Sequence, residues 1–192
     1  MYFAIAAVGC LADLWTKHAV FDALGAPGAG GRVYWVWNGF VALQPSLNEG
    51  ALFGIGQGYV LVLAVLSVVA MLAIVGWVFF GGAAEDGWLT AALGCITGGI
   101  LGNLYDRLGL HGLTWQFPAG RVGEPVHAVR DWILLQAGDQ WRWPNFNIAD
   151  ALLVCGVGLM LWHAVLIAPA AQNAASTPDA EEPSDSGACA RR

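Results

Sequence analysis

The chain has 192 residues, of which 57% are hydrophobic and only 11% are charged. Soluble domains usually carry about 25% charged residues, so this composition excludes an ordinary soluble domain and predicts a membrane protein. The net charge of -6 comes largely from an acidic cluster near the C-terminus, and the sequence has no basic patch of the kind that indicates nucleic acid binding.

The first predicted membrane span covers residues 2–20, although Asp13 and Lys17 interrupt its apolar sequence. A cleaved signal peptide is the alternative for this stretch. Such a peptide normally has a basic region before its apolar run, and none precedes the run here. We therefore expect a retained first helix.

A connection of residues 22–57 follows this span. Its segment GRVYWVWNGFVALQPSLNEG, residues 31–50, is rich in Val, Tyr and Trp and favours short strands. The motif NEGALFG, residues 48–54, contains turn-forming residues and predicts a bent loop. Because Trp is frequent where proteins meet lipid headgroups, we expect this connection to lie against the membrane surface.

Three further spans are predicted, at residues 59–80, 88–105 and 148–168. Each approaches the roughly 20 mainly apolar residues that a membrane-spanning helix needs. A tight turn at residues 81–87 joins the second span to the third, and a Trp-, Gly- and Pro-rich connection, residues 106–146, precedes the last. Residues 169–192 are rich in Ala, Pro, Ser, Asp and Glu, which predicts a disordered tail.

Together these segments predict an all-α membrane protein with four spans in one unit, residues 1–168. A small β-rich extramembrane region is expected between the first and second spans. Small residues four apart permit close helix packing in membranes, so we expect the third span to pack through Gly94, Gly98 and Gly102. The four cysteines, Cys10, Cys95, Cys155 and Cys189, show no metal-binding or CxxC spacing, and three lie in spans as small hydrophobic residues.

Polar residues collect at the side of the membrane that holds both long connections. Asp13 and Lys17 share a helix face because they are four residues apart, and the same holds for Asn103 and Arg107. The other members of this set are Asn48, Asp106, Asp131, Asn147 and Asp150. A simple interpretation is helix capping and interface anchoring, with Asn147 capping the last span and Asp150 in its first turn.

Carboxylate chemistry is the alternative, since the sequence has no Ser-His-Asp set and no metal motif such as HExxH. Two carboxylates held close share one proton, because both cannot ionise cheaply. The ionised member draws a proton from water, while the protonated member polarises a carbonyl and later serves the leaving amine. This arrangement suits peptide hydrolysis, but spacing alone does not select the two Asp residues.

Five sequence blocks follow one another along residues 13–150: DLWTK (13–17), NEGALFG (48–54), GGILGNLYDR (98–107), VRDW (129–132) and FNIAD (146–150). In this order they resemble the motifs of the bacterial lipoprotein signal peptidase family, also called signal peptidase II. The tail and the inserted connections fall outside the resemblance.

The resemblance implies a four-span aspartyl protease of the bacterial inner membrane. Such enzymes cut the signal peptide from a prolipoprotein immediately before its diacylglyceryl-modified Cys. Asp131 and Asp150 match the family's catalytic pair, and Asp106 is then better explained as structural support. The remaining family positions, some of which place substrate and loops around the pair, are matched by Asp13, Lys17, Asn48, Gly50, Asn103, Arg107, Asn147 and Ala149. The implied partners are a prolipoprotein and membrane lipid, and no metal or organic cofactor is implied.

The sequence departs from the family between Asp106 and Asp131, where 24 residues stand in place of a much shorter turn. We refer to residues 108–130 as the insertion. The family's topology places both termini in the cytoplasm and the active site near the outer face. The positive-inside rule predicts the opposite, because Lys17 and five arginines lie on the side of the long connections. We adopt the family topology, since several of these residues belong to its motifs or adjoin them.

Two non-enzymatic alternatives remain, a small proton-coupled transporter and a scaffold that binds lipidated proteins without cutting them. A proton relay predicts carboxylates spaced through the depth of the spans, whereas those of this chain cluster near one face. A scaffold would not need both Asp131 and Asp150. The sequence predicts neither the oligomeric state nor the role of the insertion.

Overall fold

The computed structural model describes residues 1–27, 32–50, 56–138 and 140–167. Its helices are α1 (Tyr2–Leu24), α2 (Val60–Phe80), α3 (Gly87–Arg107) and α4 (Ile148–Trp162). Helix α4 continues into a π-helical turn, His163–Ile167, and all four helices are long and apolar enough to cross a membrane. The four predicted spans are therefore helical. Residue 168, the predicted tail and most of the predicted bent loop, 51–54, lie outside the described residues.

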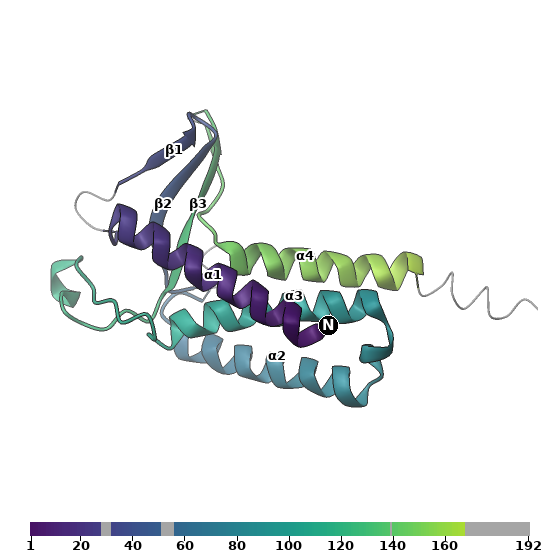
Figure 1. Ribbon diagram of the computed structural model, residues 1–192. Coiled ribbons are helices and arrows are strands. Elements are labelled where there is room, and N and C mark those ends of the chain that lie inside the picture. Colours follow the sequence, from purple (N-terminus) through teal and green to yellow (C-terminus); the bar gives the residue numbers. More distant parts are fainter. Residues whose placement is uncertain (28–31, 51–55, 139, 168–192) are drawn as a thin grey trace, which may run out of the picture.

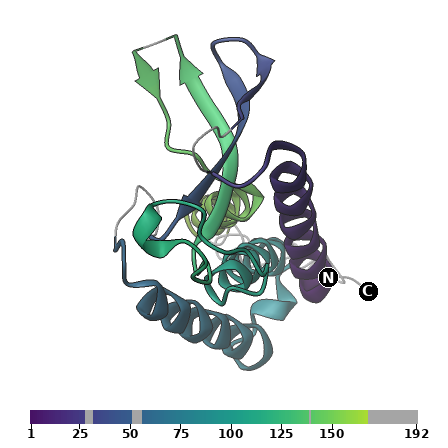
Figure 2. The ribbon, with the colours of Figure 1, turned by 90° about the vertical axis from the view of Figure 1, so that its left-hand side faces the viewer.

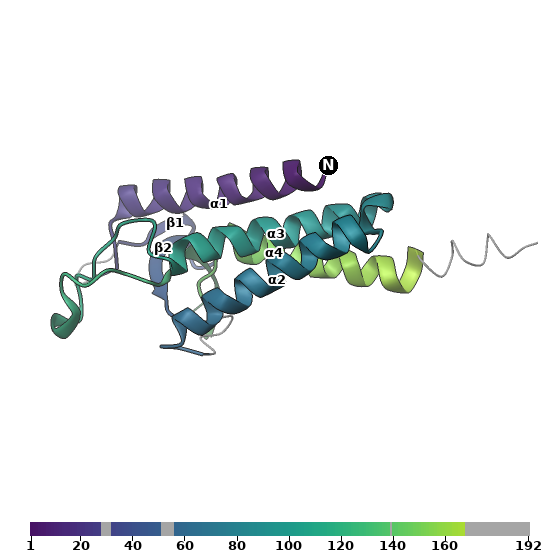
Figure 3. The ribbon, with the colours of Figure 1, turned by 90° about the horizontal axis from the view of Figure 1, so that it is seen from below.

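The four helices lie side by side, and α3 contacts each of the other three (Figures 1 and 3). The N-terminus and the end of α4 lie at one end of the helices, and the sheet stands at the other (Figure 1). Both long connections therefore meet at the sheet end. The polar residues that the sequence distributes over distant motifs are brought together there.

Helix α3 is the buried centre of this arrangement. In its most apolar stretch 61% of the residues are buried inside the protein, against 6% for α2. A Cβ atom on Gly98 would lie 3.0 Å from the Ala6 carbonyl of α1, and one on Gly99 would lie 2.5 Å from the Ala149 carbonyl of α4. Because such distances leave no room for a side chain, these glycines let α1 and α4 pack closely on α3. The predicted close packing of the third span is confirmed.

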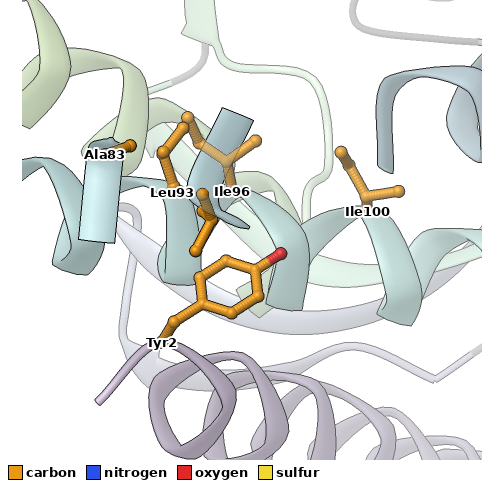
Figure 4. Close-up of a cluster of buried hydrophobic side chains, with 6 residues drawn as sticks. Tyr2, Ala83, Leu93, Ile96 and Ile100 are labelled. Atoms are coloured by element: carbon orange, nitrogen blue, oxygen red, sulfur yellow. The ribbon is translucent and has the colours of Figure 1, made fainter. Parts of the chain in front are cut away.

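An apolar cluster joins the helices at the end away from the sheet. Leu93, Ile96 and Ile100 of α3 pack with Tyr2 of α1 and Ala83 of the α2–α3 turn (Figure 4). The Tyr2 hydroxyl forms a 2.7 Å hydrogen bond with the Thr97 hydroxyl of α3, so the ring is buried without leaving its polar atom unpaired.

The sheet has four antiparallel strands in the order β1 (Tyr34–Trp37), β2 (Val41–Asn48), β3 (Val129–Ala137) and β4 (Trp141–Arg142). The strands predicted within residues 31–50 are therefore confirmed. The expectation of an all-α protein with its β structure confined to the first connection is wrong, because β3 and β4 come from the second. Strand β2 needs a hydrogen-bonding partner along its second edge, and β3 supplies it, pairing Asn48 with Val129.

The sheet rises steeply from the ends of the helices (Figures 1 and 2). Its outer strands carry aromatic side chains that are exposed to the surroundings, among them Tyr34, Trp37 and Trp141. Tyr and Trp favour membrane–water interfaces, so these aromatic side chains are the surface that we expect to contact the lipid headgroups. That location in the membrane stays a prediction.

The insertion is not a plain turn. Thr114 and Pro125 form an antiparallel bridge, and the Val126 amide donates to the Leu113 carbonyl at 3.0 Å. A short 3-10 helix, η3 (Ala119–Arg121), lies near its tip. The insertion is therefore a folded hairpin between α3 and β3.

Candidate active site

The first turn of α4 holds Asp150 in a capping box. Asn147 is the N-cap, and its side-chain oxygen accepts the Asp150 amide at 2.9 Å. In return the Asp150 carboxylate accepts the Asn147 amide at 3.3 Å, an arrangement that satisfies two unpaired helix N–H groups. The predicted cap is confirmed. The position also places the Asp150 carboxylate at the N-terminal end of α4, next to the Asn147 side chain.

Asp131 lies on β3 and is 2% exposed. One carboxylate oxygen accepts the Asn147 side-chain amide at 2.6 Å, and the other accepts the Asn48 side-chain amide at 3.1 Å. Burial, followed by the nearby charge of Asp150, raises the pKa of Asp131 to about 7. At neutral pH this carboxyl group therefore keeps its proton in a substantial fraction of molecules.

Both Asp131 and Asp150 line one cavity of about 660 Å³. Its polar part also contains Asn48, Asn103 and Arg107, and Arg107 donates to the Gly50 carbonyl at 3.2 Å. Its apolar part runs along α3 and α4 past Ile100, Leu153, Val154 and Val157. The cavity thus joins a pair of carboxylates to an apolar path between helices.

A second set of carboxylates lies beneath the cavity in a cluster of buried charges. Lys17, fully buried, contacts Asp13 at 2.7 Å and Asp106 at 3.0 Å. Arg130 donates to one Asp106 oxygen from Nε at 3.0 Å and from Nη2 at 2.8 Å. The cluster holds two anions and two cations, so each buried charge has an opposite charge beside it, as buried ions require.

Asn103 connects this cluster to the cavity. Its side-chain oxygen accepts Lys17 Nζ at 2.9 Å and the Asn147 amide at 3.2 Å, while its amide donates to Asp150 at 2.9 Å. Asp13 makes a second connection, because it accepts the Ala149 backbone amide of α4 at 2.9 Å. These bonds fix which way the Asn103 amide points and hold the start of α4 in place.

The residues selected from the sequence thus fall into two groups. Asn48, Asn103, Arg107, Asp131 and Asp150 line the cavity. Asp13, Lys17 and Asp106 form the buried cluster beneath it. Asn147 and Ala149 join the two groups through hydrogen bonds, and Gly50 joins the cavity group by accepting from Arg107.

Arg130 belongs to the VRDW block but was not among the residues predicted individually for the site. It is 4% exposed and pairs with Asp106, 24 residues away. Its place directly before Asp131 in VRDW was the available signal. In the described ranges, no group of three or more His, Cys, Asp or Glu side chains is placed to hold a metal ion.

Comparison with known proteins relates this chain to a known family. The model of the family described as signal peptidase (SPase) II matches residues 5–166. The lipoprotein signal peptidase of Rhodopirellula baltica is 52% identical over 161 residues, which are 84% of this chain and 70% of that protein. The corresponding protein of Rhodococcus jostii is 32% identical over the same shares of both chains.

Two solved structures share the fold. One, described as a bacterial membrane enzyme structure at 2.3 Å resolution, gives a TM-score of 0.69 at 22% identity and covers 94% of each chain. The other, a bacterial membrane enzyme structure at 1.9 Å, gives 0.66 at 24% identity and covers 86% of this chain and 93% of that one.

Proposed function

Because this chain belongs to the signal peptidase II family, a family of lipoprotein signal peptidases, we propose that it is an aspartic endopeptidase whose dyad is Asp131 and Asp150. The family makes the chain a multi-pass membrane protease that processes lipoprotein signal peptides. The proposal adds the mechanism, the catalytic residues and the cut immediately before the diacylglyceryl-modified Cys. The observation that carries it is the meeting of these two carboxylates in one cavity.

The raised pKa of Asp131 supports different roles for the two carboxyl groups. Asp150 acts as the base and takes a proton from water as the water oxygen attacks the scissile carbonyl carbon. Asp131 is the protonated member and gives its proton to the carbonyl oxygen. When the tetrahedral intermediate collapses, the C–N bond breaks, the proton on Asp150 passes to the amine of the Cys, and Asp131 regains a proton from the intermediate.

The apolar part of the cavity supplies a place for the substrate. Its wall of Leu153, Val154 and Val157 belongs to α4, the helix that begins at the dyad. A lipidated Cys whose acyl chains stay in the bilayer is already confined to this depth, which lowers the entropic cost of placing the bond to be cut. Prolipoprotein and membrane lipid are therefore the proposed partners.

The location of the basic residues favours the family's orientation over the charge count. Lys17 and Arg130 are bound to buried carboxylates, Arg107 to the Gly50 carbonyl and Arg121 to Glu49. These contacts explain why the basic residues are present, so the residues need not indicate the cytoplasmic side of the membrane. We propose cytoplasmic termini and a dyad near the outer face of the bacterial inner membrane.

The test uses a diacylglyceryl-modified prolipoprotein and its unlipidated twin, with the cut located by mass spectrometry. We expect wild type to cut only the lipidated substrate, before the modified Cys. Asp131→Asn and Asp150→Asn should each lose at least about a thousandfold in rate, the scale of losing a general acid or base in an active site. The matched control is Asp22→Asn, since Asp22 of α1 is exposed and pairs only with His18 among the ion pairs of the described residues.

Retained cleavage in either dyad variant would remove that residue from the catalytic pair. If folded wild type cuts neither substrate, the peptidase proposal is wrong and a transporter or scaffold function becomes the better explanation. The peptidase is favoured over a proton relay because Asp13, Asp106, Asp131 and Asp150 join a single network at the sheet end.

A further inference from the structure

The hairpin of the insertion is fastened at its base to the end of α3. His127 Nδ1 lies 3.2 Å from the Arg107 carbonyl, at hydrogen-bonding distance. The neighbouring Val126 and Ala128 are 0% exposed. The base of the hairpin is therefore packed into the fold, and its position is fixed relative to the helix that carries Arg107.

Arg121, near the tip of the hairpin, reaches across to the loop after β2. Its Nη1 donates to one Glu49 carboxylate oxygen at 3.0 Å, and its Nη2 lies 3.0 Å from the other. The guanidinium also stacks over the Trp115 ring at 4.2 Å and contacts Glu124 at 3.4 Å. Two parallel contacts fix orientation as well as distance, and the ring limits the movement of the arginine.

Glu49 stands between two residues that touch the site. Asn48 donates to Asp131 at 3.1 Å, and the Gly50 carbonyl accepts from Arg107 at 3.2 Å. The Gly50 amide donates to the Asn48 side chain at 2.9 Å, which ties the two neighbours together. Fixing the position of Glu49 therefore also fixes the Asn48–Asp131 and Gly50–Arg107 contacts relative to the cavity.

We propose that Arg121 and Glu49 are a positioning pair through which the insertion holds Asn48 against Asp131 and Gly50 against Arg107. Neither residue lines the cavity, so the pair acts through its neighbours. Its effect on rate rests on the proposed peptidase function, whereas its effect on the loop does not. The ion pair is partly exposed to solvent, so its contribution is modest and sensitive to salt.

The first experiment measures hydrogen exchange at the Gly50 amide in lipid nanodiscs. Arg121→Gln and Glu49→Gln should each exchange about three- to fivefold faster than wild type, because partly exposed ion pairs contribute little energy. Arg32→Gln, the loss of another exposed arginine, is the matched control and should match wild type. Unchanged exchange at Gly50 in both Arg121→Gln and Glu49→Gln would overturn the proposal. This readout needs no substrate, so it decides the proposal even if wild type proves inactive.

The second experiment is a double-mutant cycle on the rate of cleavage. Each single variant should lose about three- to fivefold in kcat/KM, and the double variant no more than either alone, since the two residues act as one unit. The charge-swapped variant Arg121→Glu with Glu49→Arg should recover part of the loss. Additive losses, or no loss, contradict a joint role.

The pH profile distinguishes positioning from a general structural effect. Weakening the Asn48 bond removes a donor that stabilises the charged form of Asp131, so the fall in activity at high pH should move to higher pH in both single variants. A uniform drop in rate with an unshifted profile would show that the pair does not act on Asp131.

Discussion

Two pairs of carboxylates occupy opposite ends of one hydrogen-bond network, and their surroundings differ in kind. Asp13 and Asp106 are 0% exposed and lie beside Lys17 and Arg130. Asp131 and Asp150 line the cavity and accept hydrogen bonds from neutral amides. Among the residues that the structure describes, no ion pair involves Asp131 or Asp150.

The comparison shows how one residue type can serve two purposes within a single hydrogen-bond network. A carboxylate paired with a buried cation is needed for that ion pair, because the loss of either partner leaves a buried charge without compensation. A carboxylate held by neutral amides is fixed in position, but its protonation is set by burial and by the other member of the pair. The buried cluster can therefore support the fold, and the amide-held pair can carry out acid–base chemistry.

The largest expected effect on stability comes from breaking the buried cluster. Lys17→Met leaves the Asp13 and Asp106 carboxylates without their shared cation, a change that costs about 3–5 kcal/mol when one partner of a buried pair is lost. Lys17 is the only lysine in the chain. Thermal unfolding in detergent should show a much lower midpoint for this variant. Arg32→Gln, which removes an exposed cation, is the control, and a midpoint unchanged by Lys17→Met would contradict the role of the cluster.

Replacing Asp131 of the dyad should have the opposite effect on stability from breaking the buried cluster. Because Asp131 has a folded-state pKa of about 7 against an ordinary 3.8, the folded protein binds more protons between these values, and its stability falls as pH rises through this window. Asp131→Asn removes that loss. Its free energy of unfolding should rise relative to that of wild type between pH 4 and pH 7, by an amount on the order of a few kcal/mol, and the difference should stay level at higher pH.

The same titration predicts the pH dependence of the reaction. Since the active dyad holds one proton, wild-type cleavage should decline as pH rises through about 7, where Asp131 loses its proton. Rates of cleavage at a series of pH values would check this. A rate that is still increasing well above pH 7 would contradict the assignment of Asp131 as the protonated member.

A smaller effect is expected from the glycine that makes room for the cluster. A Cβ atom on Gly102 of α3 would overlap the Asp13 carboxylate and lie 3.3 Å from the Ala149 Cβ. Gly102→Ala should therefore displace Asp13 from Lys17 and cost about 1–3 kcal/mol, as overpacking does. Gly158→Ala on α4 is the control, because nothing lies within 4 Å of its new Cβ. Equal unfolding midpoints for the two variants would show that Asp13 tolerates displacement.

The helices were predictable from the sequence because each carries a long apolar run, and the start of α4 is also marked by its cap, Asn147. Strand β3 was not. Its sequence, VRDWILLQA, carries two charged residues near its start. Arg130 binds the buried Asp106 and Asp131 lines the cavity, so neither side chain faces solvent. A strand whose polar residues serve a site loses the simple alternation on which prediction depends.

Site residues were predictable where they lie close together in the sequence, as in the FNIAD motif. Contacts between residues that are distant in the sequence were harder to predict. The Arg130–Asp106 pair joins residues on either side of the insertion, and the Arg121–Glu49 pair joins two different connections. Nothing local in the sequence selects these partners, because only the packing of α3 against the sheet brings them together.

The most direct test of the comparison is the cleavage rate per folded molecule for four variants, Asp13→Asn, Asp106→Asn, Asp131→Asn and Asp150→Asn, with the folded fraction taken from thermal unfolding of the same samples. We predict that the two dyad variants fold at least as well as wild type and do not cleave. The two cluster variants should unfold at lower temperature but retain measurable cleavage per folded molecule. A dyad variant that cleaves at the wild-type rate, or an Asp106→Asn protein of wild-type stability without activity, would contradict the division of roles.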